Sequence, residues 1–239
     1  LELRNARHRL RKKSQLIRFS RSQVIQGRPT VAVIVPVYNE NSVIKESLEH
    51  LVSLGANEVI IVDGGSTDGT YESLRKRFPS VRCYQTSFPE RALQMNSGAF
   101  ASKADVFIFA HIDMRLPSNA VDLVREKVRQ GFIGGGFKKS YDRRTWLLKV
   151  YVYFLNQVYL SGMHGLVGTN AMFVTKNVFE KMNGFAHVAL LEDVIFSESL
   201  KKHGEVAIID QRVVVSSRKY FQNGVIRQIL RNARIVIGY

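Results

Sequence analysis

The chain has 239 residues, of which 45% are hydrophobic, so it can bury a substantial core as one α/β domain and is not a disordered protein. Its 35 Lys and Arg residues outnumber 20 Asp and Glu residues, and the resulting net charge of +15 favours anionic partners such as phosphates, nucleic acid or an acidic membrane surface. Cys83 is the single cysteine, which excludes an internal disulfide and fits a reducing, cytoplasmic compartment.

The first part of the chain predicts a basic arm followed by a strand and a helix. Residues 1–28 are rich in arginine, and we place the folded domain at 29–239. The run at 31–37 is apolar throughout, which indicates a strand buried on both faces of a parallel sheet. Apolar residues at helical spacing predict a helix over 42–53, which Gly55 ends.

The same alternation continues along the chain. Strands are predicted at 58–62, 81–85 and 105–110, helices at 71–78 and 89–102, and a further helix from Ser118 or Asn119 to about Arg129. The stretch 111–119 before that helix is predicted as a loop. Strands that alternate with helices imply βαβ units, and therefore an α/β fold with a mostly parallel central sheet flanked by helices.

The second half of the chain is less regular. The pattern predicts a strand or bend at 132–137, a helix at 146–160, a strand at 171–175, a helix at 190–203, two strands at 206–210 and 212–216, and a basic amphipathic helix at 225–237 that ends the domain.

Acidic residues follow three of the predicted strands. Glu40, Asp63 and Asp113 stand at or just beyond the carboxyl ends of apolar runs, with glycines beside Asp63 that permit close backbone approach. One such residue can be a simple turn or cap residue. Ligands of open parallel sheets bind beyond the carboxyl ends of the strands, so three together predict a functional site.

Two common nucleotide-binding motifs are absent. A dinucleotide-binding protein carries G-x-G-x-x-G after its first strand, whereas this chain has PVYNE there. The sequence also has no G-x-x-x-x-G-K-[ST] phosphate loop. The glycines follow the second strand in an acidic loop, which suits a ribose or a base better than a pyrophosphate.

Five segments in order carry a specific resemblance. VAVIVPVYNE, EVIIVDGGSTDGT, RALQMNSGA, HIDMRLP and LLEDVIFSESLKKHG, spread over about 30–220, resemble the inverting family 2 glycosyltransferases, and the RALQMNSGA and HID pieces are most similar to their small, soluble bacterial-type branch. The resemblance implies a single GT-A-like (Rossmann-related) domain. It also implies transfer of a sugar from a UDP- or GDP-sugar to an acceptor hydroxyl.

The resemblance assigns residues to the nucleotide pocket. Pro36, Tyr38 and Glu40 would line it, with Tyr38 against the base. Asp63 would bind the base or the ribose, and Arg91 would reach the nucleotide from its helix.

Other implied roles concern the sugar and its diphosphate. Asp113 would hold a divalent cation, Mn or Mg, on the diphosphate, and Asp193 of the Glu192–Asp193 pair would be the catalytic base. A position near a helix start favours the ionised form of Asp193. Without the resemblance, Asp193 would be interpreted as an ordinary N-terminal helix acid. Arg218 could contact the phosphates or belong to a charged surface.

The sequence departs from the family pattern at two places. His111 stands where the family commonly has a second acid, and it can join the metal site or pack at the strand end. Thr169 and Asn170 stand where relatives of this branch often have an acid and an amide, and they could bind sugar hydroxyls.

Other functions are compatible with the charge. One is a non-enzymatic module that binds a membrane or nucleic acid, although no nucleic-acid-binding motif is found. Another is a nucleotidyltransferase on a similar fold, which should carry a basic glycine-rich loop in place of PVYNE. The basic arm and the C-terminal helix also suit peripheral attachment to the cytoplasmic face of a membrane, which can coexist with an enzyme.

Overall fold

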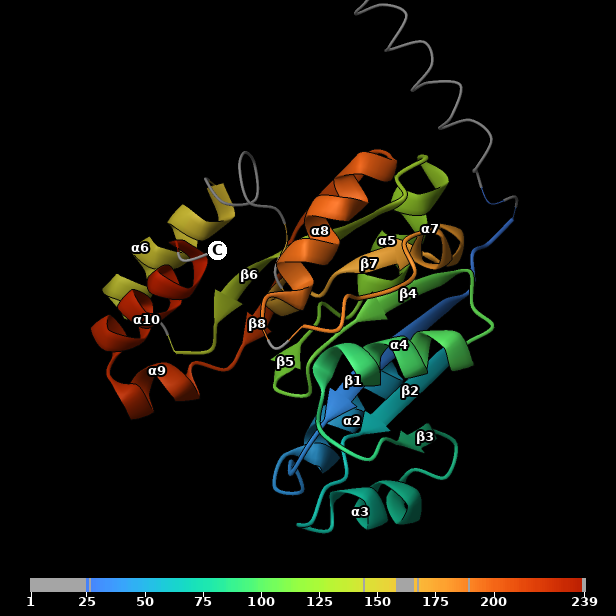
Figure 1. The fold of residues 1–239 in the computed structure, drawn as a ribbon, viewed down its shortest axis with the longest axis horizontal. Coiled ribbons are helices and arrows are strands. Elements are labelled where there is room, and N and C mark those ends of the chain that lie inside the picture. The colour runs from blue at the N-terminus through green and yellow to red at the C-terminus, as the bar shows by residue number, and fades with distance from the viewer. Residues whose placement is uncertain are drawn as a thin grey trace, which may run out of the picture.

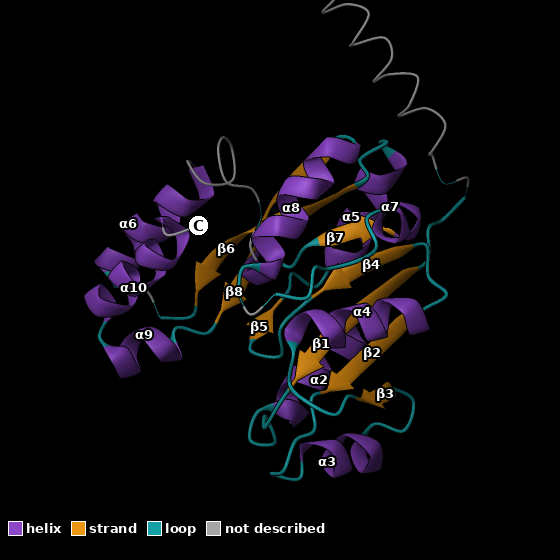
Figure 2. Cartoon of the chain, viewed as in Figure 1, coloured by secondary structure: helices purple, strands orange, loops and turns teal. Residues whose placement is uncertain are grey.

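The computed structural model describes residues 25, 27–143, 145–157, 166, 168–188 and 190–237, so the predicted basic arm lies almost entirely outside the described residues. The described part forms one eight-stranded sheet with helices on both of its faces (Figures 1 and 2). The strands are β1 (Val31–Val37), β2 (Glu58–Asp63), β3 (Arg82–Gln85), β4 (Val106–Phe109), β5 (Met114–Arg115), β6 (Gly134–Tyr141), β7 (Phe173–Thr175) and β8 (Val206–Val215). The helices are α2 (Ile44–Ser53), α3 (Thr70–Arg77), α4 (Arg91–Ala101), α5 (Ala120–Arg129), α6 (Trp146–Phe154), the 3₁₀ turn η2 (Gly168–Asn170), α7 (Lys176–Lys181), α8 (Glu192–His203), α9 (Arg218–Asn223) and α10 (Val225–Ile237).

The sheet has the strand order β3-β2-β1-β4-β7-β6-β8-β5. Neighbours from β3 to β4 are parallel, as are β6 and β8, whereas β7 is antiparallel to both of its neighbours and β5 is antiparallel to β8. The first half is therefore the βαβ array that the alternating pattern predicts, and the predicted fold class is confirmed.

The core lies on both faces of this sheet. Apolar side chains of α2, α3 and α5 pack on one face, and those of α4, α7 and α8 pack on the other. Strand β1 is buried at every position, as its unbroken apolar run predicts. Helix α4 approaches β1 and β2 closely because Gly98 has no side chain, and a Cβ there would lie 2.5 Å from Cγ2 of Ile34.

Four predictions of local structure need correction. The stretch 111–119 is not only a loop, since it contains β5. The two strands expected over 206–216 are one strand, because β8 bulges at its exposed, polar middle: Phe137 pairs with Ile209, and the next residue of β6 already pairs with Arg212. Helices α7 and α9 were not predicted, because each is only 6 residues long and starts directly after a strand or a short turn.

Other boundaries differ slightly. The helix expected over 146–160 is helical to Phe154 and continues as a wider turn to 157, and 158–160 lie outside the described residues. Asn119 precedes α5, but its side chain makes no capping hydrogen bond.

Three helices form a lobe beside β6 and β8, at the left of Figure 1. Helices α9 and α10 follow β8, and α6 lies next to α10. The buried hydroxyl groups of Tyr141 on β6 and Tyr220 on α9 share a hydrogen bond of 2.7 Å, which fastens the lobe to the sheet. None of the described helices is both long and apolar enough to cross a lipid bilayer.

Candidate active site

The carboxyl ends of β1, β2 and β4 meet at one edge of the sheet. Val37 pairs with Asp63 in the β1–β2 ladder, and the amide of Ala110, just after β4, donates to the Ile34 carbonyl at 3.0 Å. Glu40 and Asp113, which follow β1 and β4, are therefore brought to the same edge as Asp63. This juxtaposition is the one that the three strand-end acids predict.

Asp63 is fully buried, and the loop after β2 satisfies its carboxylate. Oδ2 accepts the amides of Gly65 at 3.0 Å and Ser66 at 2.9 Å, and the Gln85 side chain donates to it at 3.0 Å. Oδ1 accepts the Ser66 hydroxyl. Asp63 therefore shapes the glycine-rich loop, and because its side chain is fully buried, direct contact with a ligand would require this loop to move.

The PVYNE segment is tied to that loop. The Asn39 amide donates to the Ser66 hydroxyl at 2.8 Å, and the Asn39 side chain accepts the Thr67 amide at 2.9 Å. Asn39 has a φ of 53°, which asparagine tolerates better than most residues. The tie leaves Tyr38 44% exposed above the sheet edge, while Pro36 is buried within β1.

Gln94 is a residue of this edge that sequence reasoning missed. Its buried side chain donates to the carbonyls of Val37 at 2.9 Å and Val62 at 2.8 Å, and so joins α4 to the ends of β1 and β2. Polar residues among the apolar ones of a predicted helix, here Gln94 and Asn96, were the available signal.

Cations from α9 lie beside the strand-end acids. Pairing of Met114 with Val215 carries β8 next to the segment after β4, and the Ser216 amide donates to the Asp113 carbonyl at 3.2 Å. Burial raises the pKa of Glu40, the positive charge of Arg218 opposes this, and Asp113 adds to the rise. The positive charge of Lys219 also opposes the rise, so Glu40, Asp113, Arg218 and Lys219 lie within one neighbourhood.

A second cluster lies at the end of β4, against the start of α8. His111, Asp193, Glu192 and Arg91 line one small hollow with apolar residues of α4 and β4. Glu192 is buried and pairs with Arg91 at 3.1 Å. Leu191, with a left-handed φ of 67°, turns the chain so that both acids fall in the first turn of α8.

The charges in this hollow act on His111. Burial lowers the pKa of His111 to about 4, Arg91 adds to the fall, and Asp193 opposes it. The imidazole is therefore neutral at pH 7 and can accept a hydrogen bond or a metal ion. The Asp193 carboxylate itself accepts the Val194 amide at 2.8 Å.

Lys139 also faces this cluster. It is buried, and its Nζ donates to the Thr169 hydroxyl at 2.9 Å. Burial lowers the pKa of Lys139 to about 8, and Asp193 opposes the fall. Asn170 is buried too, and its side chain donates to the Phe137 carbonyl at 2.8 Å, so in this structure it supports β6.

The described residues contain no group of three His, Cys, Asp or Glu side chains placed to hold a metal ion. A cation that binds with a diphosphate needs only one or two carboxylates, because phosphate oxygens and water complete its shell. Asp113 with Glu40 nearby fits this smaller requirement.

The structure thus gathers the predicted residues into two groups. Glu40, Asp63, Asp113, Tyr38 and Arg218 lie around the ends of β1 and β2, and His111, Arg91, Glu192 and Asp193 lie at the end of β4. Pro36 and Asn170 are buried behind these groups.

Solved structures of known proteins share the fold of this chain. The structure resembles the mannosyltransferase PcManGT from Pyrobaculum calidifontis, solved in complex with GDP-Man and Mn²⁺, with a TM-score of 0.60 and 21% identity over 79% of this chain and 57% of that one. It also resembles residues 1–349 of S. aureus TarS, with a TM-score of 0.64 and 16% identity over 80% of this chain and 62% of that one. At these identities the likeness establishes the fold, which is the GT-A-like fold that the resemblance implied.

Sequence comparison identifies the family. The uncharacterized glycosyltransferase EpsJ of Bacillus subtilis (strain 168) is 29% identical over 128 residues, which are 50% of this chain and 37% of that protein. This chain therefore matches little more than a third of that relative's length. The model of the family described as "Glycosyl transferase family 2" matches residues 32–179, which is more than half of the chain. The chain therefore belongs to glycosyl transferase family 2.

Proposed function

We propose that the chain is an inverting glycosyltransferase that moves a sugar from a nucleotide-diphosphate sugar to an acceptor hydroxyl, with Asp193 as general base and a divalent cation at Asp113. The observation that carries the proposal is the pair of charged clusters at one sheet edge. The first mixes acids with Arg218 and Lys219, and the second holds Asp193 beside a neutral His111. Family membership supports the same reaction class.

The first cluster is the proposed nucleotide side. Tyr38 offers an exposed ring for stacking on the base, and the loop that Asp63 holds offers backbone groups to the ribose. Arg218 and Lys219, at the start of α9, are exposed cations that can contact the departing diphosphate.

The second cluster is the proposed site of bond exchange. Asp193 would take the proton of the acceptor hydroxyl while that oxygen attacks the anomeric carbon, and the bond to the diphosphate oxygen breaks on the opposite face, which inverts the centre. Asp193 lies in the first turn of α8, beside the positive end of the helix dipole. The Glu192–Arg91 ion pair would position that turn.

The cation remains part of the proposal. It would neutralise charge that develops on the diphosphate. Asp113 would hold it with Glu40 nearby. His111, two residues before Asp113, lies in the second cluster with Arg91 and Asp193. The Mn²⁺ complexed with PcManGT supports a divalent ion here without distinguishing Mn from Mg.

Two alternatives receive less support. A non-enzymatic basic module would not need the ordered charged clusters, and a nucleotidyltransferase would need a basic loop where PVYNE stands. The proposed donor is a UDP- or a GDP-sugar. The GDP-Man complex of PcManGT makes a GDP-sugar the first donor to assay. We propose a cytoplasmic location, with which the single cysteine is compatible.

Asp193→Asn tests the base. Donor binding, read as thermal stabilisation by GDP- and UDP-sugars with and without Mn²⁺, should stay near the wild-type level, whereas transfer or donor hydrolysis should fall by at least about a hundredfold. The released sugar of the wild type should have the inverted anomeric configuration. Asp210→Asn, at an acid 85% exposed on β8, is the matched control. Turnover retained by Asp193→Asn would remove Asp193 as the base, and absence of any nucleotide-sugar binding by the wild type would overturn the function itself.

A further inference from the structure

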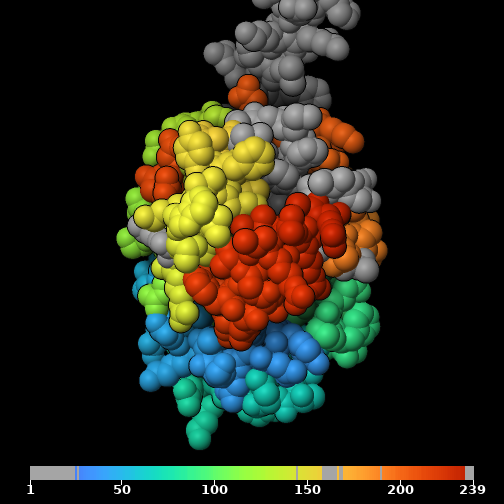
Figure 3. All heavy atoms as spheres, turned by 90° about the vertical axis from the view of Figure 1, so that its left-hand side faces the viewer, coloured from blue at the N-terminus to red at the C-terminus, as the bar shows by residue number. Residues whose placement is uncertain are grey.

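One face of the α6–α9–α10 lobe exposes large apolar side chains. Trp146, Val150, Tyr153 and Phe154 are 54–72% exposed, and their spacing places them on one side of α6, while Leu148 and Val152 on the other side are buried. Helices α6 and α10 lie side by side on this face (Figure 3). A soluble surface rarely gathers so many large apolar side chains without a partner.

Helix α10 continues the apolar face and adds charge. Ile226 and Leu230, one turn apart, are 62% and 55% exposed. Arg227, Arg231 and Arg234 are exposed on a stripe about a quarter-turn around the helix. The inward side is held by Asn232, which donates to the Tyr220 hydroxyl at 3.0 Å. The outward side therefore combines an apolar stripe with a cationic one.

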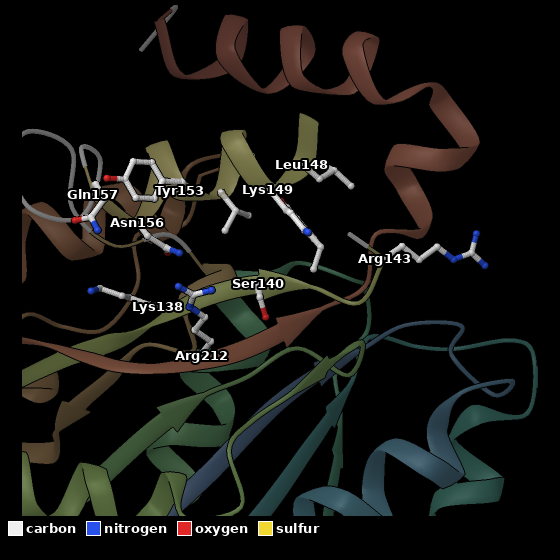
Figure 4. Close-up of a pocket in the computed structure, with 11 residues that line it drawn as sticks. Lys138, Ser140, Arg143, Leu148, Lys149, Tyr153, Asn156, Gln157 and Arg212 are labelled. Carbon is white, nitrogen blue, oxygen red and sulfur yellow. The ribbon is translucent and has the colours of Figure 1, made fainter. Parts of the chain in front are cut away.

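A cation-lined cavity lies between α6 and the β6–β8 pair. It has a volume of about 300 Å³, and Leu148 and Val152 form part of its wall. Figure 4 shows Arg212 and Lys149 reaching into this space from the strand and the helix, with Arg143 at one end. Among the described residues these three cations form no ion pair with a carboxylate, whereas Lys138, also in the wall, pairs with Asp210 at 2.6 Å.

The three helices of this lobe carry positive charge only. The sequence contains no Asp or Glu from 143 to 179, which includes α6, or from 211 to 239, which includes α9 and α10. A second copy of the same face would set these cations against one another. Nucleic acid would use the cations but would leave the exposed stripes of α6 and α10 without a partner.

We infer that this face docks on an anionic phospholipid membrane. Helices α6 and α10 would lie in the plane of the interface, with Trp146, Phe154 and Leu230 among the acyl chains and headgroups. The arginines of α10 and the cavity beside α6 would bind the headgroup phosphates. This inference goes beyond the proposed glycosyl transfer and does not depend on it, so Asp193→Asn should dock as the wild type does.

Trp146 supplies a direct probe, because it is the single tryptophan of the chain. Adding phosphatidylcholine vesicles that contain about 30% phosphatidylserine should shift its emission to the blue and shield it from iodide. Vesicles of phosphatidylcholine alone should have little effect. Co-sedimentation of the full chain with the same vesicles measures binding independently of the probe.

Two sets of substitutions remove the apolar part and the cationic part of the face separately. Val150→Ser, Phe154→Ser and Leu230→Ser together remove apolar area while keeping Trp146. Lys149→Gln, Arg227→Gln, Arg231→Gln and Arg234→Gln together remove charge. Each set should weaken vesicle binding at least about tenfold. All seven positions are exposed, so the fold should be retained.

Matched controls change the same number of exposed residues elsewhere. Val52→Ser, Phe88→Ser and Phe100→Ser match the apolar set, and Lys45→Gln, Lys76→Gln, Lys103→Gln and Lys201→Gln match the charged set. Both controls should bind nearly as the wild type does. The inference is overturned if vesicles bind without moving the Trp146 emission, if the paired sets are indistinguishable, or if duplex DNA shifts that emission and vesicles do not.

Discussion

Lys139 is a charged side chain held in a buried position near Asp193. Burial lowers its pKa from 10.5 to about 8 in the folded protein. Below pH 8 the lysine is protonated in both folded and unfolded chains, so the cost of burying the charge is fully present. Between pH 8 and 10.5 the folded chain binds fewer protons than the unfolded chain, so the free energy of unfolding rises with pH through this window.

Replacing Lys139 with methionine should remove this dependence. From pH 7 to about pH 9.5 the wild type should gain about 2 kcal/mol of unfolding free energy relative to Lys139→Met, because the variant has no charge to lose. Urea unfolding at a series of pH values measures the difference, in which the titration of other groups cancels. Lys103→Met, at an exposed lysine, should give a difference that does not change with pH. Parallel wild-type and Lys139→Met curves would show that Lys139 keeps its ordinary pKa when folded.

The packing of α4 on β1 and β2 can be tested at Gly98. Alanine is the better helix former by about 1 kcal/mol, but its Cβ would lie 2.5 Å from Cγ2 of Ile34 and 3.2 Å from Cγ2 of Val62. Crowding of this kind costs about 1–3 kcal/mol, so Gly98→Ala should destabilise the protein on balance.

A double-mutant cycle isolates this contact. Gly98→Ala together with Ile34→Ala should cost at least about 1 kcal/mol less than the sum of the two single changes, since the second change removes the atoms that the new methyl group meets. Ser97→Ala, on the same helix, should change unfolding free energy by less than about 0.5 kcal/mol. Additive effects at 98 and 34 would mean that α4 can move away from β1.

Strands and helices could be predicted where the local hydrophobic pattern determines them. The continuous apolar run of β1 and the helical spacing of α2 were sufficient, because burial on two faces or on one face is encoded locally. Strand β5 could not be predicted, since its 2 residues are a strand only because β8 lies beside them. That missed pairing shapes the candidate site, because it brings Arg218 next to Glu40.

At the scale of the whole chain, the family resemblance predicted more than periodicity did. It implied the GT-A-like fold, and it nominated Asp193, which no strand-end pattern marks. It could not predict that the loop after β2 donates hydrogen bonds to the Asp63 carboxylate. Nor could it predict that the Gln94 side chain joins the ends of β1 and β2, because such partners depend on packing between distant segments. The role of each nominated residue stays a prediction until the variants are measured.

The net charge of +15 has a consequence for the stability of the whole molecule. Like charges repel in the compact state, and their interaction range falls from about 30 Å at 0.01 M salt to about 10 Å at 0.1 M. Raising NaCl across this range should therefore raise the Tm, by about 2–4 °C for a gain of about 1 kcal/mol.

A charge-reduced variant provides the comparison. The set Lys149→Gln, Arg227→Gln, Arg231→Gln and Arg234→Gln lowers the net charge by four at exposed positions, so its Tm should start higher at low salt and rise less than that of the wild type. Thermal unfolding followed by circular dichroism at both salt concentrations measures this. The set Lys45→Gln, Lys76→Gln, Lys103→Gln and Lys201→Gln is the control. It lowers the net charge by the same four units, so the comparison separates repulsion across the whole molecule from repulsion among the cations of α6 and α10. Equal shifts for the two sets would mean that the whole field acts, whereas a larger shift for the first set would locate the repulsion in the α6–α10 face, where an anionic surface would relieve it.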